Sequence, residues 1–259
     1  GSEGLGLDTL SYIHMRVGRT AQGLLLDPRF QRLDDDAGKP ERIRVPRGTR
    51  FRVGDPLGTL NGMAHVHLSV GASGYERNAV ALGFAGYADS VPPRIDSVEL
   101  LDPLDVPLPR RSGRVEIPRS LAGVQIVVDA WDQVDRNLPR RRLGLHALGY
   151  QVLRADGTPL PGEEMPRMTI VFDRLPNDDA TKVAYAPGSG ITVHGAAVTR
   201  FRYLVSNTVR DGVYRQGLWD TGALPPGDYI VRIAARDYSG NSAMANRDLA
   251  VTILGDPGP

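Results

Sequence analysis

The 259-residue chain contains no cysteine, only two lysines and five histidines, and no long apolar run. Without cysteine there is no disulfide framework, and the redox compartment is not fixed by the sequence. No apolar stretch approaches the ~20 residues that a membrane-spanning helix needs, so no membrane span is expected. The 31 basic and 30 acidic residues nearly cancel to a formal net charge of +1. That balance gives no reason to expect nucleic acid as a partner.

What the chain does contain favours β-structure. Thirty glycines and twenty prolines separate short apolar runs, and hydrophobic residues make up 41% of the chain. Short runs between turn residues are typical of strands. The length fits one or two domains, and two is the better fit. We therefore predict an all-β protein of two domains.

The run Ala64–Val70 alternates apolar residues with two histidines. Residues i and i+2 of a strand point to the same face, so His65 and His67 are expected to project together. Two imidazoles on one strand can present a metal ligand beside a catalytic base. The alternative is a surface strand with two polar residues facing outward.

Three motifs occur in a suggestive order: Tyr12-Ile13-His14-Met15, then Val53-Gly54-Asp55-Pro56-Leu57-Gly58, then His65-Val66-His67-Leu68. This order resembles the lysostaphin/LytM-type zinc endopeptidases, which cut peptide cross-links in bacterial cell walls. The resemblance covers roughly residues 5 to 90. It implies a partial LytM-type sheet, barrel-like, at this end of the chain.

The resemblance also implies roles for the histidines. His67 would bind zinc, and His14 and His65 would flank the metal-bound water as base and transition-state stabiliser. The family takes its other two zinc ligands from an earlier His-x-x-x-Asp segment, and no histidine precedes His14. Zinc is therefore expected only where an upstream segment supplies those ligands, and the chain as written is expected to be inactive. Gly1-Ser2 is typical of a cloning or protease scar, so a missing N-terminal segment or a second chain is expected to complete the domain.

Tandem prolines at Pro92-Pro93 favour a stiff linker and predict the domain boundary. The first domain is expected over residues 1–90, with an insertion at 23–50 whose polar composition predicts a solvated loop. The second domain is expected over residues 91–259.

Seven alternating or apolar runs predict a β-sandwich in the second domain. They lie near residues 95–101, 123–131, 145–153, 168–172, 199–205, 227–235 and 246–254. The segments Leu224–Tyr229 and Ala235–Asn241 resemble those of bacterial immunoglobulin-like or fibronectin-type domains. The unit is longer than such domains, and the surplus is expected in long loop insertions at 103–120 and 174–198. Trp131 and Trp219 are expected to anchor the core.

Acidic and amide residues follow two of these predicted strands: Asp129, Asp132, Asp135, Asn137, Asp237 and Asn241. Their oxygens could line one end of the sandwich and bind calcium. Asp and Asn also form Asx turns at such positions, and turns are the favoured interpretation.

The sequence thus predicts a LytM-type metallopeptidase-family protein that acts on peptidoglycan, zinc-dependent if the missing ligands are supplied. One alternative is a degenerate, zinc-free module that binds peptidoglycan or regulates another enzyme. A further alternative is a structural or adhesive pair of β domains. The expected partner is peptidoglycan or its peptides, and the expected location is extracytoplasmic, in the periplasm or at the cell surface of a bacterium.

Overall fold

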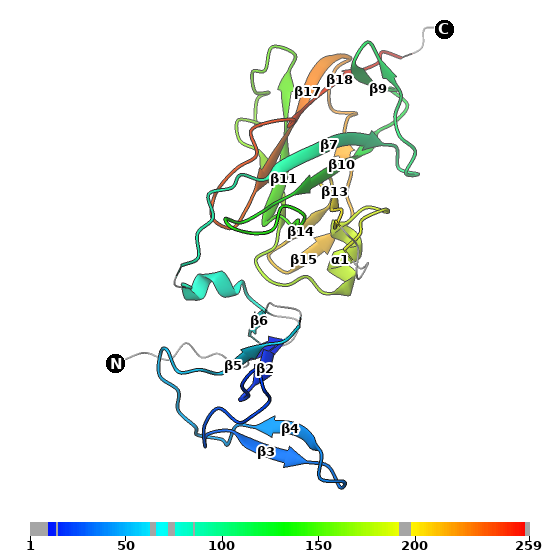
Figure 1. The fold of residues 1–259 in the computed structure, drawn as a ribbon. Helices are drawn as coiled ribbons and strands as arrows, with labels where there is room; N and C mark the ends of the chain where they lie inside the picture. Colours follow the sequence, from blue (N-terminus) through cyan, green and yellow to red (C-terminus); the bar gives the residue numbers. More distant parts are fainter. Residues whose placement is uncertain are drawn as a thin grey trace. The chain divides into compact units, whose positions relative to one another are not determined.

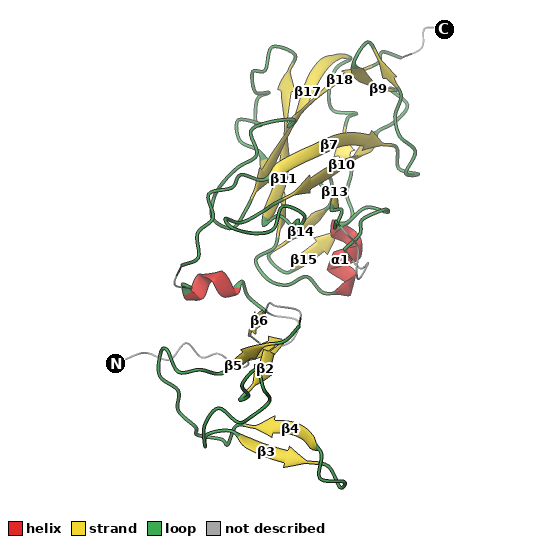
Figure 2. Ribbon diagram, viewed as in Figure 1, coloured by secondary structure: helices red, strands yellow, loops and turns green. Residues whose placement is uncertain are grey.

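The computed structural model describes residues 10–13, 15–62, 66–71, 76–84, 86–191 and 198–256. The chain divides into two compact units, Gly1–Leu82 and Gly83–Pro259 (Figure 1). The prediction places the corresponding boundary at residues 90/91. Strands dominate both units, and the helices of the described residues, red in Figure 2, are one α-helix and one short 3-10 helix. The all-β prediction is confirmed, and no helix in the described ranges is long and apolar enough to cross a membrane.

Three antiparallel strand pairs make up the described part of the first unit. These are β1 (Leu10–Ile13) with β6 (His67–Val70), β2 (Met15–Val17) with β5 (Gly58–Leu60), and β3 (Gln31–Asp34) with β4 (Pro40–Arg44). A 3-10 helix follows at Ala79–Leu82. Among the residues described in this unit, the buried large apolar side chains are Phe30 and Val70.

The prediction of a loop over residues 23–50 is wrong for residues 31–44, where β3 and β4 form a hairpin, whereas residues 23–30 and 45–50 contain no helix or strand. The Asp34–Asp36 run lies at its turn, where the carboxylate of Asp35 accepts backbone hydrogen bonds from Ala37 at 3.0 Å and Lys39 at 2.8 Å. The hairpin strands carry charged residues on most positions, so they lack the apolar alternation that marks a strand in a sequence.

An arginine ties this hairpin region to the Gly54-Asp55-Pro56 turn. Arg29 forms ion pairs with Asp27 and Asp55, and its guanidinium lies 4.6 Å from the centre of the Phe51 ring. One cation thus neutralises two carboxylates and stacks on an aromatic face, a geometry that suits the planar guanidinium.

Two sheets form the second unit. In the smaller one, β10 (Gly123–Trp131) pairs antiparallel with β7 (Arg94–Leu101), β13 (Arg202–Leu204) and β16 (Trp219–Asp220). The larger sheet has the order β15-β14-β12-β11-β17-β18-β9-β8. Its strands are β8 (Arg110–Arg111), β9 (Arg114–Ile117), β11 (Ala147–Arg154), β12 (Arg167–Val171), β14 (Thr208–Arg210), β15 (Val213–Arg215), β17 (Gly227–Arg236) and β18 (Asp248–Ile253).

One hydrophobic core lies between the two sheets. Alternate residues of β17 and of β10 belong to this cluster. Val127 of β10 belongs to a second, small cluster with Leu101, Ala186 and Leu204. Trp219 belongs to the main cluster, as predicted. Trp131 is buried but belongs to neither cluster; its indole N–H donates to the Asp96 carboxylate, and Arg142 stacks on its ring. Burial of apolar area at about 25 cal/mol per Å² makes this core the main source of stability. The unit is therefore a β-sandwich, held by the same alternation that predicted its strands.

The predicted surplus regions contain regular structure. Residues 103–120 include the β8–β9 hairpin, and residues 174–198 include helix α1 (Asp178–Ala184). Asn177 caps this helix by accepting a hydrogen bond from the Ala180 amide at 2.8 Å.

Tyr229 holds the segment that precedes β17 in place. The Tyr229 hydroxyl donates a hydrogen bond to the backbone carbonyl of Pro225 at 3.0 Å. This is the arrangement of a tyrosine corner, in which the ring is buried and its hydroxyl bonds to the backbone a few residues upstream.

A substitution at Gly149 can test how tightly β11 and β12 pack in the larger sheet. The pairing of β11 with β12 shifts register beside it, and a Cβ at this position would overlap the backbone carbonyl of Arg167. Since the obstacle is backbone, Gly149→Ala should lower the free energy of unfolding by about 1–3 kcal/mol or more. The matched control, Gly255→Ala, places its methyl in open space and should leave stability unchanged. Equal urea midpoints for the two variants would show that the sheet relaxes at this bulge.

Candidate metal centre

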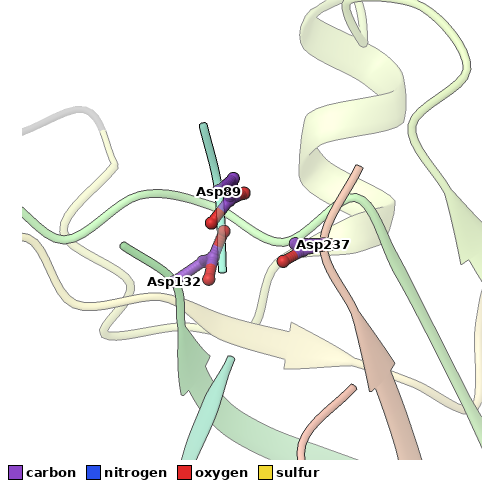
Figure 3. Close-up of side chains that lie close together, drawn as sticks. All are labelled: Asp89, Asp132 and Asp237. Carbon is purple, nitrogen blue, oxygen red and sulfur yellow. The ribbon is translucent and has the colours of Figure 1, made fainter. Parts of the chain in front are cut away.

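Three aspartates meet at one end of the sandwich. Asp132 directly follows β10 of the smaller sheet, and Asp237 directly follows β17 of the larger sheet. Asp89 lies in the segment that precedes β7. Each carboxylate contributes an oxygen, and these oxygens all lie within 4.8 Å of one another. Figure 3 shows the three side chains converging from separate segments. The group could hold a metal ion.

Local turns hold two of the three carboxylates in place. The Asp237 carboxylate accepts hydrogen bonds from the Asn241 backbone amide at 2.8 Å and from its side-chain amide at 2.6 Å. The same Asn241 amide group donates to the backbone carbonyl of Asp89 at 3.0 Å, and Ser239 donates to the Asp89 carboxylate at 3.1 Å. The β17 turn therefore fixes both its own aspartate and the segment that carries Asp89.

The backbone of Asp132 is paired on both sides. Its amide and carbonyl both pair with Leu143, at 2.9 Å in each direction. A register shift at Asp129/Ala130 in the pairing of β10 with β7 lies just before it. Such irregularities commonly redirect side chains at the end of a sheet.

The electrostatics of the group are unusual. Asp132 and Asp237 are only 5% and 3% exposed, and one Asp132 oxygen, Oδ1, is buried without a hydrogen-bond partner. No lysine or arginine among the described residues forms an ion pair with any of the three aspartates. Burial raises the pKa of Asp132 to about 7 from an ordinary 3.8. The Gln133 backbone amide opposes that rise, and the charges of Asp237 and Asp89 add to it.

Asp129 is a second buried carboxylate in the same sandwich, and arginine side chains neutralise it. It is 8% exposed and accepts hydrogen bonds from Arg200 at 2.8 Å and from Arg202 at 3.1 Å. The prediction that Asp129 belongs to the same group of oxygens as Asp132 is therefore wrong, because two guanidinium groups take its oxygens.

Other residues of the predicted acidic set form turns and links. The Asp135 carboxylate accepts hydrogen bonds from the Ser90 amide at 2.9 Å and hydroxyl at 3.1 Å. Asn137 accepts from the Leu138 amide at 2.9 Å. Asn137 accepts from the next residue and Asp237 from a residue four positions on, so neither makes the bond to residue i+2 that defines an Asx turn. The Asx-turn interpretation is therefore wrong for these two residues.

Sequence reasoning missed Asp89, which lies in the run Tyr87-Ala88-Asp89-Ser90 before the tandem prolines. That run was assigned to the first domain, so its acid was not considered beside Asp132 and Asp237. An acidic residue just ahead of the first strand of a sandwich, at the end where two other strands terminate in Asp, is the signal that could have revealed it.

The predicted histidines are placed only in part. His14 and His65 lie outside the described residues. His67 begins β6, and its backbone pairs with Ile13. His146 of the second unit makes an edge contact with Tyr238, with ring centres 5.1 Å apart.

A pocket of about 760 Å³ lies elsewhere in the second unit and is lined by residues that include Gln125, Tyr185, Asn207 and Gln216. The Asn207 amide donates to the Val183 carbonyl and its oxygen accepts from the Gly217 amide, both at 2.8 Å. Gln125 donates to Asp102 and Asp105. These polar groups are engaged in holding the fold.

No family model matches this chain, and no curated protein matches it.

The chemistry of the centre follows from its donors, which are three carboxylates. Carboxylate oxygens suit hard cations, while imidazole and thiolate suit softer ones.

The raised pKa of Asp132 should make the stability of the metal-free protein depend on pH. Its folded-state pKa is raised, so the folded chain holds the proton more tightly than the unfolded chain does. The resulting stabilisation is complete below about pH 4 and is lost as the pH rises through about 7. The Asp132→Asn variant has no carboxyl group to ionise at this position. In EDTA, its melting temperature should therefore rise relative to that of the wild type as the pH increases from 5 to 8.

Thermal unfolding of both proteins across this range measures the difference. Asp135→Asn is the control, since it removes a neighbouring carboxylate that is bonded to Ser90. Parallel curves for Asp132→Asn and the wild type would contradict a perturbed Asp132.

Proposed function

We propose that the first unit is the C-terminal part of a LytM-type domain and that the protein acts on bacterial peptidoglycan, in the periplasm or at the cell surface. One observation carries the proposal, namely the antiparallel pairing of β1 with β6 in the register Ile13↔His67. This pairing joins β1, which carries Tyr12 and Ile13 of the first motif, to β6, which carries His67 and Leu68 of the third, although more than fifty residues separate Ile13 from His67.

The pairing matters because residues directly opposite in antiparallel strands have Cα atoms only ~4.5–5.5 Å apart. The LytM resemblance requires its two histidine segments to be neighbours, and Ile13, which faces His67, is the residue before His14. The pairing of β2 with β5, in the register Met15↔Leu60, continues the same arrangement into the segment after the Gly-Asp-Pro turn. Both pairings support the family relationship.

The residues of this chain do not by themselves fit zinc. A catalytic zinc site uses about three protein ligands, and the resemblance assigns one, His67, to this chain. We therefore propose zinc-dependent peptidase activity, with His14 and His65 in the roles of base and transition-state stabiliser, only for a protein in which two further ligands are supplied. For the chain itself the donor set favours the alternative, zinc-free binding of peptidoglycan.

The second unit is proposed to be an immunoglobulin-like domain that presents the first unit to the cell wall. Its two-sheet core and the Tyr229–Pro225 hydrogen bond support this identification. Fold alone does not assign a function, so the peptidoglycan proposal rests on the histidine strands.

Co-sedimentation with purified peptidoglycan tests the proposal. The chain should pellet with sacculi in EDTA, and His67→Ala should weaken binding about tenfold, which corresponds to about 1.4 kcal/mol. His146→Ala is the matched control, because it removes an imidazole that packs on Tyr238 in the other unit. A chain that stays in the supernatant, or equal losses in the two variants, would contradict the proposal.

A further inference from the structure

The aspartate centre of the second unit involves none of the histidines, so it can be argued independently of the peptidoglycan proposal. Its three carboxylates concentrate negative charge at a place where two of them are almost fully buried. Burying an ionised carboxylate is strongly unfavourable unless a cation or hydrogen bonds compensate it. Asp129, near the same end of β10, receives that compensation from two arginines, and Asp132 receives it from no described side chain.

The orphaned oxygen of Asp132 is a second observation that points to a ligand. The Asp132 side chain is directed into the group of three (Figure 3), and its Oδ1 atom is buried with no hydrogen-bond partner. Buried polar atoms in folded proteins are nearly always satisfied, and an exception calls for an ion, a water molecule or a catalytic role. A cation between the three carboxylates would satisfy this atom and neutralise the charge together.

We infer that Asp89, Asp132 and Asp237 form a binding site for calcium, which ties the two sheets of the sandwich to the lead-in segment, residues 86–92. The geometry suits this ion. Calcium–oxygen distances are about 2.3–2.6 Å, so two ligands on opposite sides of one ion lie about 4.6–5.2 Å apart. The three oxygens lie within 4.8 Å of one another, which one calcium ion can span.

Competing ions fit less well. Zinc prefers nitrogen and sulfur ligands, and the centre offers carboxylates. Magnesium requires distances of about 2.0–2.1 Å and retains several waters, so it rarely uses a cage made entirely of protein oxygens. Calcium takes six to eight oxygen ligands, which can include hydroxyl groups and water. The Ser239 hydroxyl, which donates to the Asp89 carboxylate at 3.1 Å, places one further oxygen beside the three carboxylates.

The position of the site gives the ion a structural role. Asp132 continues a strand of the smaller sheet, Asp237 continues a strand of the larger sheet, and Asp89 belongs to the lead-in segment. Two hydrogen bonds from Ser90 to Asp135 attach the same segment to the loop after β10. A bound calcium ion would therefore join three stretches of chain that converge at this end of the unit.

Calorimetric titration of the EDTA-treated full chain with calcium chloride tests the site. We expect one calcium ion per chain with a Kd of about 10⁻⁴ M or tighter, and a higher melting temperature at about 10 mM calcium. Magnesium should bind at least about tenfold more weakly. Asp132→Asn and Asp89→Asn should each weaken calcium binding at least about tenfold. The control is Asp156→Asn in an exposed turn, where an asparagine oxygen can also accept the Thr158 hydrogen bond, and its affinity should stay within about twofold of the wild type.

Asp89→Asn keeps the test decisive if Asp132→Asn fails to fold, because Asp89 is only half-buried. Absence of both heat and a thermal shift at this calcium concentration would overturn the inference. So would wild-type affinity in Asp89→Asn, or an equal loss in Asp156→Asn, which would reveal a diffuse attraction by negative charge. Failure of these measurements leaves the peptidoglycan proposal untouched, since that proposal is measured in EDTA.

Discussion

Compensation of buried negative charge is the constraint on which the end of the second unit depends. The sandwich places two carboxylates, Asp129 and Asp132, three residues apart at the end of its central strand, and both are almost inaccessible to solvent. Arg200 and Arg202 neutralise the first. The second faces two further carboxylates, and among the described residues no cation faces it. An uncompensated acidic group is unfavourable in a fold held mainly by apolar burial, which is why we assign it to ion binding.

The sandwich itself explains why these groups meet. β10 and β17 belong to opposite sheets that share one hydrophobic core, so the residues that follow them emerge at the same end. The Asn241 amide links the turn after β17 to the backbone of Asp89. The apolar core thus brings together polar residues from positions 89, 132 and 237, which lie far apart in the sequence.

Part of this arrangement could be predicted from sequence. The strand 123–131 was predicted with the bounds that the structure shows, because valine and isoleucine, which favour strands, are frequent in it. The partners of Asp129 could not be predicted, since they lie 71 and 73 residues away and are brought near by strand pairing. The β3–β4 hairpin was missed because its strands are mostly charged. The histidine strands were found from motif order, and His14 and His65 lie outside the described residues.

Amide hydrogen exchange, measured with and without calcium, is the most direct test of calcium binding at the three aspartates. Tying three segments with one ion predicts that residues 86–92, the turn after Asp132 and the turn after Asp237 all gain protection together. The centres of β11 and β18, which lie within the larger sheet, should change far less. Unchanged exchange in all three segments at saturating calcium, or protection of only one of them, would contradict the account.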